Sequence, residues 1–290
     1  MAAVGECDAL AYAIEDIVEY FDCKTEAILH RYGPGPRVHY HAGLIDHPPS
    51  PDAPAHSLRQ RLIAGQERAL RYAIEAWKAA PNLKGEVLDV GCGLGGGAIF
   101  LAQEFGAKVT AVTCVPSHIR WVTRFAAEAG VESLVRPVLA DATQIPGENC
   151  FDAVIAVDSS GYLPRKPWFR RLASLLRPGG HAFIVDCFVS KPDYEKPFNR
   201  HWRTRIGTTS EYQTAALDAG LLPGVAEDIS RRTEHFWTTT LALLQIEARE
   251  PNQNPAEVHR RQQSKYAHDL VRRGLAEGSL SYELLSYFKS

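Results

Sequence analysis

Short apolar runs alternate with amphipathic stretches through most of this chain. Runs rich in branched apolar residues predict strands buried on both faces, and the segments between several of them have helical spacing. The predicted strands cover residues 86–90, 108–113, 134–140, 151–157, 182–189, 222–229 and 280–288. Strands that alternate with helices form a parallel sheet that binds its ligands at the carboxyl ends of the strands. The chain is therefore predicted to be an α/β protein.

Further helices are predicted on either side of this repeating pattern. The first runs from about Asp8 to Leu29 and carries an apolar stripe of Leu10, Ile14, Ile17 and Phe21; the second covers about 58–77. Proline and glycine make the segment between them irregular. Residues 190–207 are also expected to be irregular, a helix follows at 209–219, and two more form an insertion at about 234–278. We expect residues 1–57 to form an N-terminal helix and cap segment, and residues 58–290 to form the main domain.

Composition narrows the range of partners and the compartment. The formal net charge is −2, which gives no electrostatic footprint for nucleic acid or for an anionic membrane. No stretch is long and apolar enough for a membrane span, and the first residues do not have the pattern of a signal peptide. The six cysteines occur singly, so neither a zinc site nor a disulfide framework is predicted. A cytoplasmic location is expected.

The candidate binding site begins at Asp89-Val90-Gly91-Cys92-Gly93, directly after the first predicted strand. Its glycines permit positive φ and allow a ligand to lie against bare backbone, and the following helix directs free N–H groups toward that ligand. Such a turn alone fits a dinucleotide site equally well, or a tight turn without any ligand.

Polar residues also follow the next strands, and together these motifs point to one family. They are Thr113-Cys114, Asp141-Ala142, Asp158-Ser159-Ser160 and the turn Arg177-Pro178-Gly179-Gly180. The succession from 86 to 189 resembles the class I S-adenosylmethionine-dependent methyltransferases. The resemblance implies a Rossmann-like sheet of seven strands, with an antiparallel last strand, an N-terminal helical cap and a helical insertion before that strand. It also implies S-adenosylmethionine as cofactor and S-adenosylhomocysteine as product.

The same resemblance implies which residues contact the cofactor. They are Asp89, Gly91, Cys92, Gly93, Thr113, Cys114, His118, Asp141, Ala142, Val157 and Tyr32. Thr113 stands where most of the family has an acidic residue for the ribose. This departure is similar to the branch that contains cyclopropane fatty acid synthases, tocopherol methyltransferases and terpenoid C-methyltransferases. His118 stands where that branch has Gln, and an ordinary residue in the first turn of a helix is its alternative.

The segments that flank the core are rich in aromatic rings, which suit a carbon acceptor. Methylation of an alkene generates a carbocation, and aromatic faces stabilise cations. Asp158-Ser159-Ser160-Gly161-Tyr162 resembles a Glu-Ser-x-x-Tyr/His segment of terpenoid C-methyltransferases, in which the acidic residue faces the acceptor. Asp158 is then a base or a charge that stabilises the cation, and a strand-end cap is its alternative. Tyr20, Tyr162 and Trp202 are the candidate catalytic rings.

Over its whole length the chain resembles bacterial geranyl diphosphate C-methyltransferase-like enzymes, and most closely those that act on prenylated natural products, as in teleocidin biosynthesis. The implied reaction methylates an alkene carbon of a small hydrophobic terpenoid and can trigger rearrangement or cyclisation. No acidic pair lies beside Arg165, Lys166, Arg203 and Arg205 in the sequence, which favours a neutral acceptor over a free diphosphate.

Several alternatives remain at this point. A phenol, sugar or amine acceptor would make the protein an O- or N-methyltransferase, and a binding protein without catalysis would need a damaged glycine turn. His39 and His41 invite a structural metal, but no carboxylate partner is obvious and no metal is predicted. Because the proline-rich tether cannot bury the stripe of the first helix, we expect a homo-oligomer in which this helix is exchanged between subunits.

Overall fold

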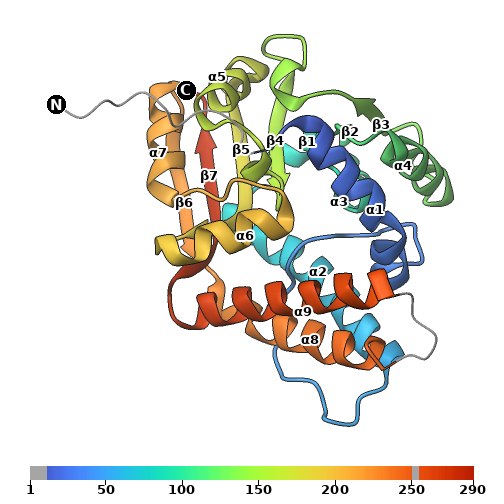
Figure 1. The fold of residues 1–290 in the computed structure, drawn as a ribbon. Helices are drawn as coiled ribbons and strands as arrows, with labels where there is room; N and C mark the ends of the chain where they lie inside the picture. The colour runs from blue at the N-terminus through green and yellow to red at the C-terminus, as the bar shows by residue number, and fades with distance from the viewer. Residues whose placement is uncertain (1–11, 250–254) are drawn as a thin grey trace.

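A computed structural model describes residues 12–249 and 255–290 (Figure 1). Within these ranges one mixed sheet has the strand order β3-β2-β1-β4-β5-β7-β6. The strands are β1 (Glu86–Val90), β2 (Lys108–Thr113), β3 (Val135–Leu139), β4 (Phe151–Val157), β5 (Leu176–Val189), β6 (Leu222–Asp228) and β7 (Leu280–Phe288). Only β7 runs antiparallel to both of its neighbours, β5 and β6. The predicted seven-stranded sheet with its antiparallel last strand is confirmed.

The order of the strands reverses beside β1, and this reversal positions the site. The chain goes from β1 outward to β2 and β3, and then returns to the other side of β1 as β4. Leu88 of β1 pairs with Thr110 of β2 and with Val154 of β4, so all three strands end at the same edge. In open α/β sheets, ligands bind in the crevice at this reversal, beyond the carboxyl ends of the strands.

Helices cover both faces of the sheet. One buried cluster joins α2 (Ala55–Trp77), α3 (Gly96–Phe105) and α4 (Pro116–Glu128) to one face. A second cluster joins α5 (Arg165–Leu175) and α7 (Thr209–Asp218) to the opposite face. Each strand of the centre is therefore buried on both sides, which explains its continuous apolar sequence.

Three further helices enclose the site. They are α1 (Ile14–Tyr32), α8 (Glu234–Glu247) and α9 (Pro255–Ala276), and α8 and α9 lie side by side below the sheet in Figure 1. Glu247 of α8 is 3% exposed and accepts hydrogen bonds from Arg31 of α1 at 2.9 Å and from Arg59 of α2 at 3.3 Å. This buried ion pair cluster fixes α1 to the rest of its own chain.

Two segments differ from their prediction. Residues 190–207 contain a helix, α6 (Glu195–Trp202), in which Phe198 and Trp202 are four residues apart and pack against each other with their ring centroids 4.5 Å apart. The turn at 177–180 lies inside β5: Leu176 already pairs with Phe151, and the register shifts before His181 pairs with Ala153.

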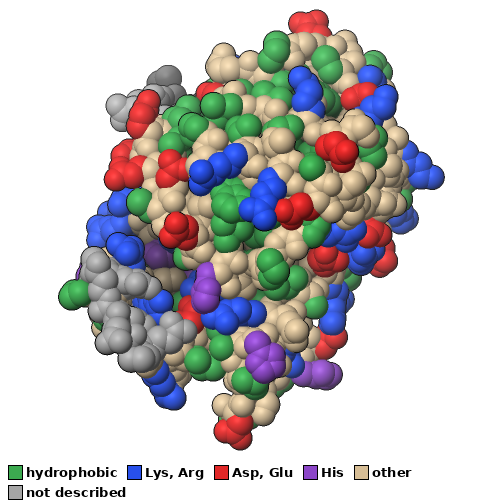
Figure 2. All heavy atoms as spheres, turned by 90° about the vertical axis from the view of Figure 1, so that its right-hand side faces the viewer, with side chains coloured by type: hydrophobic (Ala, Val, Ile, Leu, Met, Phe, Trp, Pro, Cys, Tyr) green, Lys and Arg blue, Asp and Glu red, His purple; other side chains and the backbone are tan. Residues whose placement is uncertain are grey.

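Other differences concern boundaries and the surface. Helix α1 continues to Tyr32, while its predicted start near Asp8 lies outside the described residues. Acidic and basic side chains are interspersed on the face shown in Figure 2. Among the helices that the structure describes, none has the length and apolar character that would let it cross a bilayer.

Candidate functional site

The turn after β1 presents backbone to a cavity. Gly91, Gly93 and Gly95 all have positive φ, and Gly95 is the N-cap of α3. A Cβ added at Gly91 would lie 2.5 Å from the Cβ of Ser159, whereas a Cβ at Gly93 would meet no atom within 4 Å. Gly91 is therefore required by close packing, and Gly93 is bare backbone beside open space. The free N–H groups at the start of α3 are directed to the same region.

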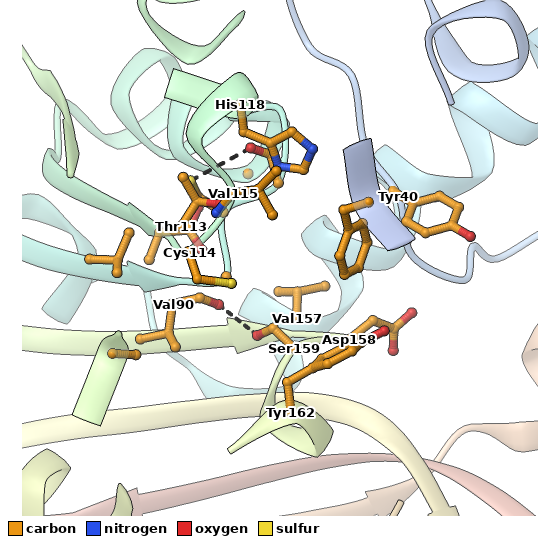
Figure 3. A pocket seen from close by; sticks show the side chains of 18 of the residues that line it. Tyr40, Val90, Thr113, Cys114, Val115, His118, Val157, Asp158, Ser159 and Tyr162 are labelled. Atoms are coloured by element: carbon orange, nitrogen blue, oxygen red, sulfur yellow. Dashed lines mark hydrogen bonds between the residues drawn. The ribbon is translucent and has the colours of Figure 1, made fainter. Parts of the chain in front are cut away.

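This first cavity lies over the carboxyl ends of β1, β2 and β4, and the empty space in it, open mouth included, is about 1160 Å³. Its lining includes Asp89, Gly91, Cys92, Gly93, Thr113, Cys114, His118, Asp141, Ala142 and Val157. In Figure 3, Thr113, Cys114, Val115 and His118 lie along one side, with Tyr40 across from them. The structure thus brings together every predicted cofactor residue except Tyr32.

Asp89 contributes an unpaired carboxylate oxygen to this cavity. The residue is 4% exposed, and its Oδ2 atom has no hydrogen-bond partner among the described residues. Burial raises the pKa of Asp89 to about 7, although the backbone N–H of Ala98 acts in the opposite direction. A ligand that brings a cationic hydrogen-bond donor would therefore find its partner here.

His118 is not an ordinary exposed residue of a first helical turn. Its side chain is buried, and its Nε2 atom lies 3.1 Å from the hydroxyl of Thr25 on α1. Burial lowers the pKa of His118 to about 4, so the ring is neutral at neutral pH. Thr113 closes the turn between β2 and α4, because its hydroxyl accepts a hydrogen bond from Val115 N–H at 3.1 Å. His118 therefore links α1 to the edge of the first cavity.

A second cavity with aromatic walls adjoins the first. Its rings come from Phe21, Tyr32, Tyr40, Tyr162, Phe198, Trp202, Phe236, Trp237 and Tyr282. The residues that line both cavities are Phe21, Tyr40, His41, Asp158 and Tyr162, and we call these five the junction. Tyr32 lines only the second cavity, because it lies at the end of α1, beyond the junction. The structure thus places Tyr32 on the second cavity and not on the first, and its contact with the cofactor stays a prediction.

Asp158 stands at the junction in an unusual conformation. Its φ of 47° is left-handed, a strained region for a residue other than glycine. Its Oδ2 atom accepts a hydrogen bond from Ala42 N–H at 3.0 Å, and its buried Oδ1 atom has no partner within the described part of the chain. Burial raises the pKa of Asp158 well above its usual range, and the charge of Asp186 raises it further. Both effects favour the protonated form of the Asp158 carboxyl.

Asp186 is the better candidate for the ionised carboxylate of this pair. It accepts hydrogen bonds from the Ser160 hydroxyl at 2.6 Å, from Gly161 N–H at 3.2 Å and from Cys187 N–H at 2.8 Å. Burial raises the pKa of Asp186 too, but these donors oppose the shift. The Tyr282 hydroxyl, which is buried beside the Asp158 carboxyl, is a further polar group in the second cavity.

The three predicted rings are placed differently from one another. Tyr162 lies at the junction and donates a hydrogen bond to the carbonyl of Trp202 at 2.8 Å, and Trp202 lines the second cavity. Tyr20 lines neither cavity; its hydroxyl accepts a hydrogen bond from Lys24. Consecutive helical side chains point about 100° apart, so Phe21 faces the junction in its place. The Tyr20 hydroxyl lies beside that of Tyr40 at the junction, and its contact with the acceptor stays a prediction.

Two site residues escaped the sequence reasoning. Gln66 is fully buried on α2 and donates hydrogen bonds to the carbonyls of His39 at 3.2 Å and His41 at 2.9 Å. The sequence signal that could have identified Gln66 is its position as a polar residue between Leu62 and Leu70 on an apolar helical stripe. For Asp186 the signal was a charge within an apolar strand. In the described ranges, no group of three His, Cys, Asp or Glu side chains could hold a metal ion.

Comparisons with known proteins agree with this architecture. A family described as "Methyltransferase domain" matches residues 87–180. Geranyl diphosphate 2-C-methyltransferase of Streptomyces lasalocidi is 28% identical over 240 residues, which cover 77% of this chain and 78% of the relative. The 27-O-demethylrifamycin SV methyltransferase of Amycolatopsis mediterranei is 32% identical over 162 residues, which cover 52% of this chain and 59% of the relative.

A solved structure of geranyl diphosphate methyltransferase with GPP and sinefungin has the same fold. Its TM-score is 0.80 and its identity 22%, with 96% of this chain and 99% of that chain covered. The similarity includes the helices on the first cavity as well as the sheet, since nearly the whole of both chains is aligned.

Proposed function

Because this chain is a class I S-adenosylmethionine-dependent methyltransferase, we propose that it transfers the methyl group of that cofactor to an alkene carbon of a neutral prenylated or terpenoid molecule. The observation that carries the proposal is the junction. There, the cavity over the glycine turn adjoins a cavity with aromatic walls, and the five junction residues line both.

The first cavity fits the cofactor. The bare backbone at Gly93 leaves room for it, and the orphan Oδ2 of Asp89 suits its ammonium group. Thr113 and Cys114 would face the ribose, and Asp141 with Ala142 would face the adenine. When bound, the cofactor supplies an electrophilic methyl group on a sulfonium. The protein then has to orient an acceptor in line with that methyl group.

The second cavity would orient and protect an alkene acceptor. When the π electrons of the alkene take up the methyl group, the positive charge moves to an acceptor carbon. The faces of Phe21, Tyr40 and Tyr162 at the junction stabilise such a charge, and the buried walls exclude the water that would capture it.

A neutral acceptor suits this cavity better than a diphosphate. Among the described residues that line either cavity, none is Lys or Arg. A diphosphate placed there would lose its hydration without gaining a cationic partner. We therefore propose a prenylated indole or phenol, a class in which a cation on the side chain can be captured by ring closure, as in teleocidin biosynthesis.

A heteroatom acceptor is the second candidate. The unpartnered Nε2 atom of His41 at the junction could also take a proton from a phenol or an amine. The relative from Amycolatopsis mediterranei, whose name places its methyl group on oxygen, is consistent with this alternative.

The homo-oligomer with an exchanged first helix and the cytoplasmic location also stay proposals. Ile17 and Ile28 of α1 are buried within their own chain, so exchange is not required to bury the apolar stripe. A variant that lacks residues 1–30 should lose turnover, because Phe21 leaves the junction. Light scattering on that variant tests exchange separately: a smaller particle supports it, and an unchanged particle contradicts it.

The acceptor class can be tested with labelled S-adenosylmethionine and a panel of prenylated indoles, prenylated phenols and prenyl diphosphates. We expect label transfer to the neutral prenylated compounds. Transfer to the diphosphates alone would contradict the neutral acceptor. Transfer to the same indoles and phenols without their prenyl groups, at an equal rate, would contradict the alkene as the site of methylation.

A further inference from the structure

The segment from His39 to Ala42 crosses the junction as irregular backbone held from two sides. From α2, the side-chain amide of Gln66 donates to the carbonyls of His39 and His41. From the end of β4, the carboxyl of Asp158 accepts the N–H of Ala42. Ala42 itself is 1% exposed. A segment without regular secondary structure is thus fixed in position where the two cavities meet.

Because the segment is held in this way, a hydrogen bond to Ala42 determines which nitrogen of the His41 ring can accept a proton. Its Nδ1 atom lies 2.8 Å from the carbonyl oxygen of Ala42, which only accepts hydrogen bonds, so Nδ1 carries the proton. The neutral ring therefore keeps its lone pair on Nε2. That atom is buried and has no partner among the described residues, and His41 is one of the residues that line both cavities.

We propose that Nε2 of His41 accepts the proton that the acceptor loses after methylation. The inference rests on the proposed function and deepens it. The π electrons of the alkene form the new bond to the methyl carbon, and the electrons of the broken S–C bond stay on sulfur. A C–H bond next to the cationic carbon then breaks, its electrons form the new double bond or its equivalent, and the proton moves to Nε2. The positive charge of the sulfonium thus ends on the imidazolium of His41.

Other groups nearby are less suited to this step. Asp158 uses one oxygen to hold Ala42, and burial raises the pKa of its carboxyl, so it serves as a positioning residue. His39 lines only the first cavity. The Nδ1 atom of His268 lies 2.6 Å from the carbonyl of Ser264, and its ring lies 5.8 Å from that of Trp202, at the end of the second cavity that does not reach the junction.

The basicity of His41 is compatible with this role. Burial lowers the pKa of His41 to about 4, while the hydrogen bond to Ala42 opposes that shift. The ring is therefore neutral at pH 7, and its lone pair is free. A weak base is sufficient, because a C–H bond next to a carbocation is strongly acidic.

The test compares His41→Gln with two matched variants, His39→Gln and His268→Gln, on a geranyl-substituted indole. We expect His41→Gln to lower turnover about a hundredfold, as for the loss of a general base. Its remaining product should shift toward alcohols formed by water capture or toward isomers that have lost a different proton. The two control variants should retain the product ratio of the wild type. An unchanged ratio in His41→Gln, or an equal shift in His268→Gln, would overturn the inference.

These outcomes are distinguishable from failure of the proposed function. If the wild type gives only O- or N-methyl products on the whole panel, the proposed function is wrong. If it gives C-methyl products and His41→Gln gives the same ones at the same rate, only the role of His41 is wrong.

A second measurement needs neither substrate nor a folded variant. In ¹⁵N-histidine spectra of the wild-type protein at pH 7, assigned through the backbone, Nε2 of His41 should have the shift of an unprotonated ring nitrogen. Addition of sinefungin should not change that tautomer. A protonated Nε2 in either sample would contradict the proposal.

Discussion

At the scale of single residues, the site depends first on positions where a side chain is absent. We expect Gly93→Ala to weaken S-adenosylhomocysteine binding at least tenfold, because its methyl group would point into the space that the ligand needs. Calorimetry measures this effect. Gly106→Ala is a matched control, since Gly106 has a similar positive φ, also meets no atom within 4 Å, and lies at the other end of α3.

Both substitutions should cost about 1–2 kcal/mol of stability from the left-handed backbone. Only Gly93→Ala should change the affinity. Equal affinities in the two variants would contradict the placement of the ligand at the glycine turn.

Asp89 predicts how cofactor affinity depends on pH. Its raised pKa of about 7 means that the carboxyl group is increasingly protonated below that pH. The ammonium group of the ligand requires the carboxylate, so binding must first release a proton. Affinity for S-adenosylhomocysteine should therefore decrease as the pH falls from 8 to 6, by about tenfold in total, with the steeper part below the pKa. In Asp89→Asn this part of the dependence should vanish; a slope identical to that of the wild type would contradict it.

Which residues the sequence could assign follows from how each is placed. Asp89, Thr113 and Asp141 follow strands that end at one edge, so local sequence and sheet topology are sufficient to bring them together. Tyr20 and Tyr32 lie on α1, where the rotation of the helix against the sheet decides which ring faces a cavity. That rotation depends on contacts such as Thr25 with His118, which are distant in sequence.

At the scale of elements, α1 closes the first cavity through a small number of contacts. We expect Thr25→Val to leave His118 Nε2 buried without a partner and to cost about 1–3 kcal/mol of stability. Denaturant unfolding measures this cost, and hydrogen exchange should show faster opening of α1. Thr123→Val is the control, because the exposed Thr123 bonds only to the carbonyl of Ile119 in its own helix.

If both variants lost the same stability and exchanged alike, the link between α1 and α4 would have no energetic role.

The elements themselves were largely predictable, and the exceptions have physical causes. The strands of the centre are buried on both faces, so their apolar runs are unmistakable. Helix α6 was not predicted because it is short, and because Pro197 and the charged residues of 195–203 obscure its helical spacing of apolar residues. Its rings Phe198 and Trp202 share one side of the helix, which lines the second cavity.

At the scale of the whole molecule, two cavities with different lining residues meet at the junction. Backbone and an orphan carboxylate mark the first, and rings without any Lys or Arg mark the second. Placing a cationic side chain in the second should exclude a neutral acceptor without affecting the cofactor. We expect Phe198→Lys to lower turnover of a geranyl-substituted indole at least tenfold and to leave S-adenosylhomocysteine affinity within about twofold, as measured by calorimetry. The control is Phe198→Leu, which should retain most of the activity.

Full activity in Phe198→Lys would place the acceptor elsewhere than in the second cavity.

The destination of the methyl group tests the central claim most directly. The purified protein is incubated with S-adenosylmethionine carrying a ¹³C-labelled methyl group and with the prenylated indole, and the product is examined by ¹³C NMR. Our proposal predicts that the labelled carbon is bonded to a carbon of the prenyl side chain. A labelled methyl group on oxygen or nitrogen would contradict it.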